Sequence, residues 1–136
     1  MTEKNTEQRV YRFTDICLIS ADVQSMVRFY ETVFAVTAAE DSDDMHSGVN
    51  VGGLNIRIDS ARLSESDTFY YVSERSSDNT IIGFDVEDVD DEYERLLGLG
   101  VQILNQPTTH PWGVRSFQLK DPDGNILNFR SFPKTV

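Results

Sequence analysis

The same order of elements occurs twice along this chain of 136 residues. Each copy begins with an alternating stretch, continues with an aspartate and a helical pattern, and ends with three more extended stretches. The two aspartates, Asp22 and Asp88, lie 66 positions apart, and Val23 matches Val89 at the same offset. An internal repeat constrains the fold strongly, because each copy must form one unit of similar structure. Two copies are too few for a solenoid and indicate one pseudo-symmetric domain.

The first copy predicts a strand, a helix and three further strands. Arg12–Ser20 alternates as a half-buried strand. Asp22 is an N-cap candidate for a helix that runs to about Phe34 on the spacing of its apolar residues. Gly52-Gly53 separates the last two strands and is a hairpin signal. These three strands are predicted at Val36–Glu40, Ser47–Val51 and Leu54–Asp59.

The second copy repeats the order from Thr80–Val86 onward, with Asp88 as the N-cap candidate and Gly98 and Gly100 ending the helix. Its remaining strands are predicted at Val101–Leu104, Trp112–Leu119 and Ile126–Phe132, the last two flanking the turn signal Asp121-Pro122-Asp123-Gly124-Asn125. We therefore expect an α+β domain of two tandem βαβββ modules that form a cupped mixed sheet with the helices on its outer face. Residues 1–10 are expected to be a frayed arm and 11–136 the single domain, with module one over about 11–59, a connector over about 60–79 and module two over about 80–132.

Net charge and composition narrow the classes of ligand that the protein is expected to bind and the compartment in which it is expected to work. A net charge of −11 argues against binding to nucleic acid or to an anionic membrane, and it is compatible with a cationic or neutral ligand. Cys17 is the only cysteine, which rules out an intrachain disulfide and fits a reducing compartment. We expect the polar N-terminus not to be a signal peptide, and no apolar run approaches the length of a membrane span. We expect a cytoplasmic protein.

Three motifs at matching places carry a family resemblance. Asp22 is followed across its helix by Phe29-Tyr30, Ile82–Asp88 opens the second module, and Asp121–Asn125 reads DPDGN. Together they cover about 13–132 and resemble the glyoxalase/bleomycin-resistance/dioxygenase superfamily, also called the vicinal oxygen chelate superfamily. Ala35 departs from the family pattern, which usually has glycine there.

The stretch Pro111–Phe117, followed by the DPDGN turn, is similar to bleomycin-resistance proteins. Those proteins sequester a cationic, aromatic antibiotic in a cleft between two subunits. The resemblance therefore implies a ligand cleft of this type and a homodimer.

The resemblance also identifies four positions at which enzymes of the superfamily bind a divalent metal, most often through His or Glu. In this sequence they are Asp15, Arg57, Ile81 and Asn128. Isoleucine has no lone pair to offer, and arginine has no acceptor and carries a permanent positive charge. A metal needs several anionic or neutral donors. We expect no metal and no cofactor, and we expect Asp15 to pair with Arg57 at these positions.

Side-chain alternation along the strands predicts which residues line the cup. The aliphatic and aromatic residues turn one way and mostly polar residues turn the other. Each of these residues also has a purely structural interpretation. Asp15 and Arg57 could form a structural ion pair, Trp112 could pack at a subunit contact, and Cys17 could be an inert buried thiol. The predicted ligand-binding residues are Asp15, Cys17, Arg57, Trp112, Ser116, Gln118, Asn128 and Arg130.

The sequence favours a metal-independent small-molecule binding protein of the bleomycin-resistance type over an enzyme. A flat cationic ligand would stack on Trp112, and Asp15 and the overall charge would attract it. The first alternative is a lyase, isomerase or dioxygenase of the same fold, with an atypical metal site or metal-free acid/base chemistry at Asp15. The second is a structural or regulatory dimer without a ligand.

Overall fold

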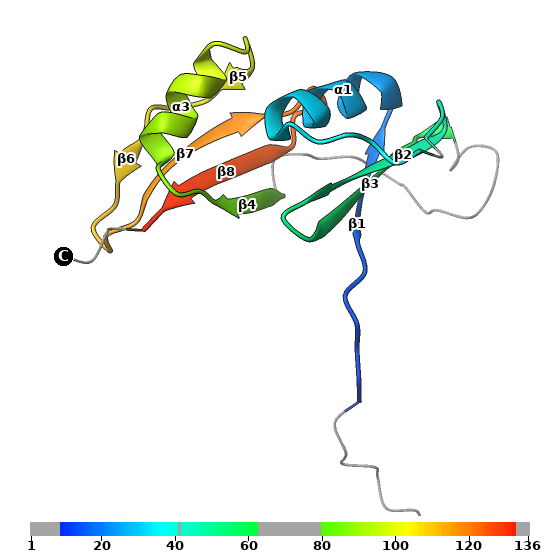
Figure 1. Ribbon diagram of the computed structural model, residues 1–136, viewed down its shortest axis with the longest axis horizontal. Helices are drawn as coiled ribbons and strands as arrows, with labels where there is room; N and C mark the ends of the chain where they lie inside the picture. Colours follow the sequence, from blue (N-terminus) through cyan, green and yellow to red (C-terminus); the bar gives the residue numbers. More distant parts are fainter. Residues whose placement is uncertain (1–8, 41, 63–79, 133–136) are drawn as a thin grey trace, which may run out of the picture.

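Two sheets and two helices form the part of the chain that the computed structural model describes, residues 9–40, 42–62 and 80–132 (Figure 1). In module one, β3 (Leu54–Ser60) lies between β1 (Ile16–Ser20) and β2 (His46–Val51). β1 runs parallel to β3, and β2 runs antiparallel to it. The helix α1 (Val23–Phe34) connects β1 to the hairpin. The α+β class and the duplicated order are confirmed.

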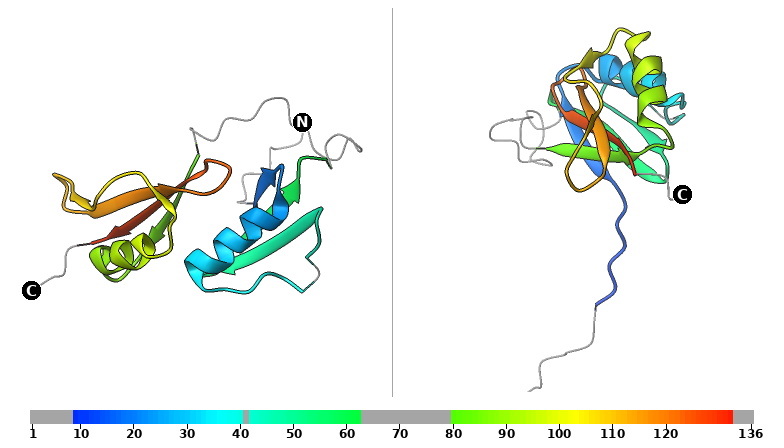
Figure 2. Two further views of the ribbon diagram at one scale, coloured as in Figure 1. Left: turned by 90° about the horizontal axis from the view of Figure 1, so that it is seen from above. Right: turned by 90° about the vertical axis from the view of Figure 1, so that its left-hand side faces the viewer.

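Module two repeats this arrangement in a five-stranded sheet. Four of its strands follow the order β4-β8-β7-β5, and the fifth, β6, also pairs with β7. β4 runs parallel to β8, as β1 does to β3. Both helices lie on the same side of the two sheets, and the modules sit side by side when viewed from above (Figures 1 and 2). The elements are β4 (Ile81–Asp85), α3 (Val89–Leu97), β5 (Gln102–Ile103), β6 (Thr108–Thr109), β7 (Arg115–Lys120) and β8 (Ile126–Ser131).

The predicted helix and hairpin signals act locally as expected. The Asp22 carboxylate accepts a hydrogen bond from the Ser25 amide, and Asp88 accepts from the amides of Asp90 and Asp91. Gly52 and Gly53 both have positive φ, of 57° and 91°, as a tight two-residue hairpin requires. Ala35 ends α1 in the left-handed conformation with φ of 54°. The residue that departs from the family pattern therefore adopts the conformation for which glycine is usual.

Three predicted strands differ from those observed by more than one residue at an end. Residues 36–40 do not form a regular strand. Their one backbone hydrogen bond to β2 runs from the Ala39 N–H to the Gly48 carbonyl, because the Ala38 N–H donates to the Glu31 carboxylate instead. The first strand begins at Ile16 rather than Arg12. The strand expected from Trp112 begins at Arg115, and the short β6 pairs with it unpredicted. Most of the predicted connector, 63–79, lies outside the described residues.

One continuous hydrophobic core joins the modules, and α1 forms its seam. Phe34 of α1 contacts Phe84 and Phe129 of module two, with ring centroids 4.7 and 5.9 Å apart. The buried Tyr30 hydroxyl donates a hydrogen bond of 2.8 Å to Asp121 in the β7–β8 turn. Burial and the nearby carboxylates raise the pKa of Tyr30, so this proton stays in place. The module-one helix thus covers apolar surface on both sheets, and the polar faces turn the other way.

The described helices contain no segment that is both long and apolar enough to cross a membrane. Residues 9–14 have no regular secondary structure and run away from the folded body (Figures 1 and 2).

Replacing Tyr30 with Phe should lower the free energy of unfolding by about 1–2 kcal/mol, because the buried Asp121 carboxylate loses one of its donors. Urea denaturation monitored by circular dichroism measures the change. Tyr11→Phe is the matched control, since Tyr11 is exposed and should tolerate the change. Equal stability of Y30F and wild type would show that the hydrogen bond does not hold the seam.

Candidate functional site

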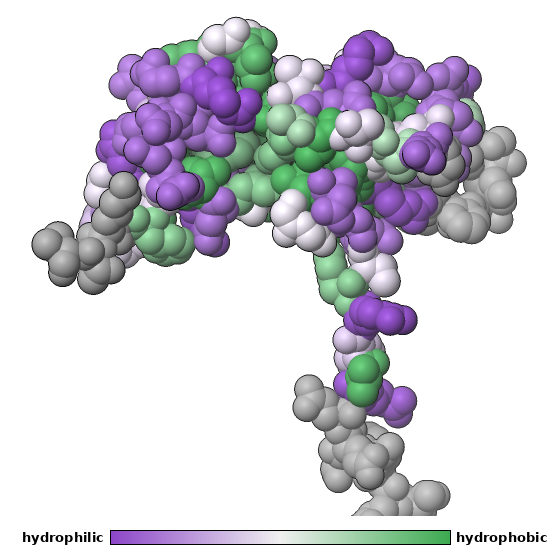
Figure 3. Space-filling view, in the orientation of Figure 1, coloured by the Kyte–Doolittle hydropathy of each residue, from purple (hydrophilic) through white to green (hydrophobic). Residues whose placement is uncertain are grey.

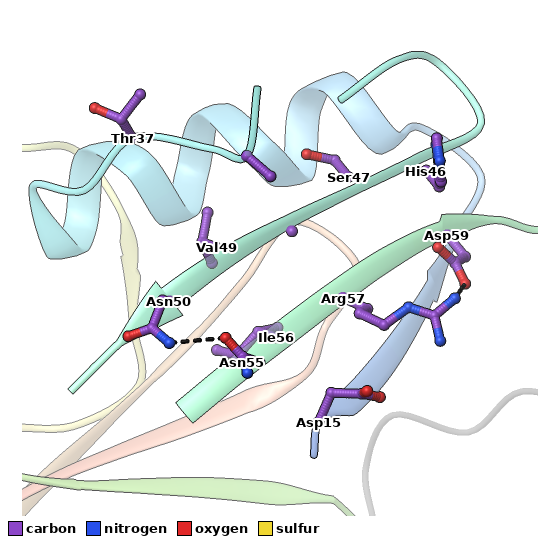
Figure 4. Close-up of a pocket in the computed structure, with 12 residues that line it drawn as sticks. Asp15, Thr37, His46, Ser47, Val49, Asn50, Asn55, Ile56, Arg57 and Asp59 are labelled. Carbon is purple, nitrogen blue, oxygen red and sulfur yellow. Dashed lines mark hydrogen bonds and ion pairs between the residues drawn. The ribbon is translucent and has the colours of Figure 1, made fainter. Parts of the chain in front are cut away.

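A cavity of about 470 Å³, lined by both polar and apolar residues, lies on module one, next to the hairpin of β2 and β3 (Figure 4). Asp15 and Arg57, both predicted as ligand residues, line it. The amide of Asn50 donates to Asn55 at 2.7 Å, and Asn55 in turn donates to the Thr14 carbonyl at 3.1 Å. The cavity therefore offers a carboxylate, a guanidinium and fixed amide groups to a bound molecule.

The ion pair at this cavity is not the predicted one. Arg57 contacts Asp59 at 2.6 Å, and no ion pair within the described chain joins Arg57 to Asp15. Residues two positions apart on a strand point to the same face, so Asp59 reaches Arg57 without any other element. Asp59 is fully buried and Arg57 is partly exposed. The predicted Asp15–Arg57 pair is therefore wrong, although both side chains line one cavity (Figure 4).

Cys17 lies beside this pair on β1, directly opposite Arg57 in the strand register. Its Sγ contacts the Asp59 carboxylate at 3.3 Å. Burial, and then the hydrogen bond to Asp59, raise the pKa of the thiol to about 12. A thiol protonated at neutral pH is a poor nucleophile. This favours the interpretation of Cys17 as an inert, partly buried thiol.

Module two carries an aromatic platform made of Trp112, His110 and Ser116. The indole of Trp112 is 74% exposed and stacks on the His110 ring, with centroids 4.8 Å apart and planes 5° apart. His110 Nε2 lies 2.9 Å from the Ser116 hydroxyl on β7. Ser116 is buried, so its contact with Nε2 holds the His110 ring in place against one face of the indole. The other face of the indole is available to a planar group.

The remaining predicted residues lie on the same polar face of module two. Gln118 and Asn128 sit opposite each other on β7 and β8, and the Gln118 amide donates to the Asn128 carbonyl. Arg130 pairs with Asp85 at 2.6 Å and lies over the Phe132 ring at 5.6 Å. The alternation inferred from the sequence is confirmed here, since Phe117 and Leu119 are buried in the core.

The predicted ligand residues thus form two groups in one chain. Asp15, Cys17 and Arg57 lie on module one, and the other five lie on module two. Among the described residues, none of module two lines the cavity beside β2 and β3. The sequence analysis did not select His110. Its position six residues before Ser116, across a short hairpin, was a signal that could have found it.

A family model matches residues 12–129, and it describes the glyoxalase/bleomycin resistance protein/dioxygenase superfamily. This match spans most of the chain. The protein belongs to the glyoxalase/bleomycin resistance protein/dioxygenase superfamily. No curated protein matches its sequence significantly.

Solved structures share the fold at low sequence identity. A glyoxalase/bleomycin resistance protein/dioxygenase from Nocardioides has a TM-score of 0.80 and 20% identity, with 96% of this chain and 93% of that one covered. A family enzyme from Burkholderia phytofirmans has a TM-score of 0.77 and 20% identity, with 88% and 98% covered. A virulence protein from Salmonella typhimurium has a TM-score of 0.72 and 20% identity, with 93% and 100% covered. At this identity the likeness concerns the fold.

The metal of the superfamily's enzymes does not fit the residues at its four positions. Arg57 presents a guanidinium, and Ile81 presents a hydrocarbon side chain. The Asn128 carbonyl already accepts from Gln118. Within the described ranges, no three His, Cys, Asp or Glu side chains gather into a ligand cluster.

Alkylation of Cys17 should be slow at neutral pH and should accelerate through pH 9.5 without levelling off, because the folded thiol has a pKa near 12. The rate follows the thiolate fraction, and Cys17 is the only cysteine, so mass spectrometry reports on it alone. The urea-unfolded chain is the control, and its rate should level off near the ordinary cysteine pKa of about 8.5. Below a pH of about 8.5 the thiol is protonated in both the folded and the unfolded chain. The free energy of unfolding should fall as the pH rises above that value, because only the unfolded thiol then ionises. A plateau below pH 9 in the folded protein would contradict the raised pKa.

Proposed function

We propose that this protein binds a cationic, aromatic small molecule without a metal and that it works as a homodimer. The observation that carries the proposal is the exposed indole of Trp112, held flat against His110 by the His110–Ser116 contact. A rigid aromatic face loses little conformational freedom on binding, and it attracts a cation through the ring quadrupole.

Charge supports the same ligand class. The chain carries a net charge of −11, which raises the local concentration of cations. Asp15 adds a carboxylate at the cavity of module one, and Arg57 there is neutralised by Asp59. The polar amides of Asn50 and Asn55 supply hydrogen-bonding groups beside it. Sequestration needs affinity only, so it requires no nucleophile and no metal.

The division of the site between modules supports the homodimer. The cavity of module one and the Trp112 platform of module two do not share lining residues within one chain. A dimer that sets module one of one chain against module two of the other would join the carboxylate, the amides and the aromatic face into one cleft. Each ligand would then contact both chains.

Titration of the protein with bleomycin and with ethidium should quench its intrinsic tryptophan fluorescence, because Trp112 is the only tryptophan and its face is open. Trp112→Ala should weaken binding by about 1–2 kcal/mol in calorimetry, and Trp112→Phe, the matched control, should retain most of the affinity. Unchanged fluorescence across a panel of planar cations would remove the basis for this ligand class.

Elemental analysis of the purified protein should find far less than one divalent metal per chain, because Arg57 and Ile81 stand at two of the four ligand positions of the family's enzymes. Thermal denaturation with added zinc, nickel or manganese should show no shift in Tm. Stoichiometric zinc, iron, nickel or manganese in the purified protein would favour the alternative of an enzyme with an atypical metal site.

A further inference from the structure

A second cavity, of about 390 Å³, lies beside α1 where that helix meets module two, and we call it the seam pocket. Three segments line it: α1, the connection from α3 to β5, and the end of β7 with the turn that follows. Ser25, Phe29 and Thr32 share one face of α1, because residues three or four apart in a helix lie one above the other. Small-molecule sites usually measure about 300–1,000 Å³. The seam pocket has that size, and it shares no lining residue with the cavity beside β2 and β3.

Part of the wall of the seam pocket is apolar. Phe29 and Val101 pack against the hydrophobic core while part of their surface stays open. Leu99, on the connection to β5, is 41% exposed. Hydrophobic surface is visible where the two modules meet, between their more hydrophilic outer parts (Figure 3). An apolar group bound in the seam pocket would therefore be removed from water.

Two basic side chains, Arg28 and Lys120, line the same pocket. Neither takes part in an ion pair of the described residues. Acidic residues outnumber basic ones by 23 to 12 in this chain, so carboxylate partners are plentiful. Other basic side chains of the folded body do pair with carboxylates, namely Arg57, Arg95, Arg115 and Arg130. Two positive charges without a partner at one pocket favour an anion there.

Asp121 also lines the seam pocket, but its carboxylate is occupied within the protein. Oδ1 accepts hydrogen bonds from the amides of Asp123 and Asn125. Oδ2 accepts from the Tyr30 hydroxyl and from the side-chain amide of Asn125. The residue is only 3% exposed. Its negative charge is thus held by four donors of the protein and leaves the two basic side chains available to a ligand.

We propose that the seam pocket binds an amphiphilic carboxylate, a small molecule with one carboxylate group and a short apolar chain. The carboxylate pairs with Arg28 and Lys120, since the planar guanidinium matches a carboxylate in geometry and charge. The apolar chain lies against Phe29 and Leu99. This site prefers the opposite charge to the proposed cation site, and all its lining residues belong to one chain. It therefore depends neither on the ligand class proposed above nor on the homodimer.

Occupancy of the seam pocket should stabilise the junction of the modules. The Phe29 ring contacts the Tyr30 ring edge to face, with centroids 5.2 Å apart, and Tyr30 donates to the buried Asp121. The pocket exists only while α1 and module two are packed together. A ligand that binds the folded chain and not the unfolded one raises the melting temperature. The amphiphilic carboxylate is thus expected to raise Tm in proportion to its affinity.

The test uses octanoate as the probe in calorimetry and in thermal denaturation. We expect octanoate to bind and to raise Tm, whereas octan-1-ol, which has the chain without the charge, and acetate, which has the charge without the chain, should bind more weakly. Arg28→Gln should weaken octanoate binding about fivefold or more. Arg12→Gln is the matched control, because Arg12 is exposed outside the pocket and the change removes the same charge. R12Q should bind octanoate like wild type.

A second pair of variants tests the apolar wall. Leu99 and Leu104 are both 41% exposed, and only Leu99 lines the seam pocket. Leu99→Ser should weaken octanoate binding about threefold or more, and Leu104→Ser should not. Circular dichroism checks that the variants are folded.

Three outcomes would overturn the proposal. The first is no binding of octanoate by the wild type at millimolar concentration. The second is equal affinity within either matched pair of variants, which would place the anion elsewhere or attribute its binding to overall charge. The third is binding of octan-1-ol as tight as that of octanoate, because the charge would then not be recognised. Quenching of Trp112 by planar cations is measured separately, so failure of the seam pocket and failure of the cation site are distinguishable.

Discussion

The buried hydrogen bond from Tyr30 to Asp121, with the Phe34 stack beside it, joins the two modules across one hydrophobic core. Each module has a small sheet that cannot bury its apolar face alone. α1 supplies apolar cover to both sheets, and the Asp121 carboxylate gives the buried Tyr30 hydroxyl an acceptor, as a buried polar group requires. Both sheets therefore share one core and direct their polar faces away from the helices.

The polar faces define what the protein can bind. On module one the guanidinium of Arg57 is held by a fully buried carboxylate, so a fixed positive group stands where the family's enzymes place a metal ligand. On module two, side-chain amides pair with each other and an arginine pairs with Asp85. What remains available to a ligand is the carboxylate of Asp15, the amides next to it and the exposed indole of Trp112. These groups are the basis of the proposed recognition of a cation by charge and stacking, which needs no Lewis acid.

Recognition and assembly are connected through the same duplicated architecture. The two halves of the proposed cleft lie on different modules, so the proposal requires a second chain to bring them together.

Local signals in the sequence determined much of the fold. The repeat, the caps Asp22 and Asp88 and the Gly52-Gly53 hairpin each depend on neighbouring residues, and all were predicted correctly. The alternation of β3, β7 and β8 also identified which side chains leave the core, because a strand has a strict two-residue period.

Tertiary structure decided the partners. Sequence alone paired Arg57 with Asp15, since the two correspond to positions that meet at one metal in relatives, whereas the structure pairs Arg57 with Asp59 on its own strand. The stack of His110 on Trp112 depends on how a short hairpin folds back, and no periodicity encodes that. Residues 36–40 had the pattern of a strand, but the Ala38 amide donates its hydrogen bond to the Glu31 carboxylate and not to a neighbouring strand. A pattern specifies which face a side chain takes, and only the packed chain specifies which group it meets there.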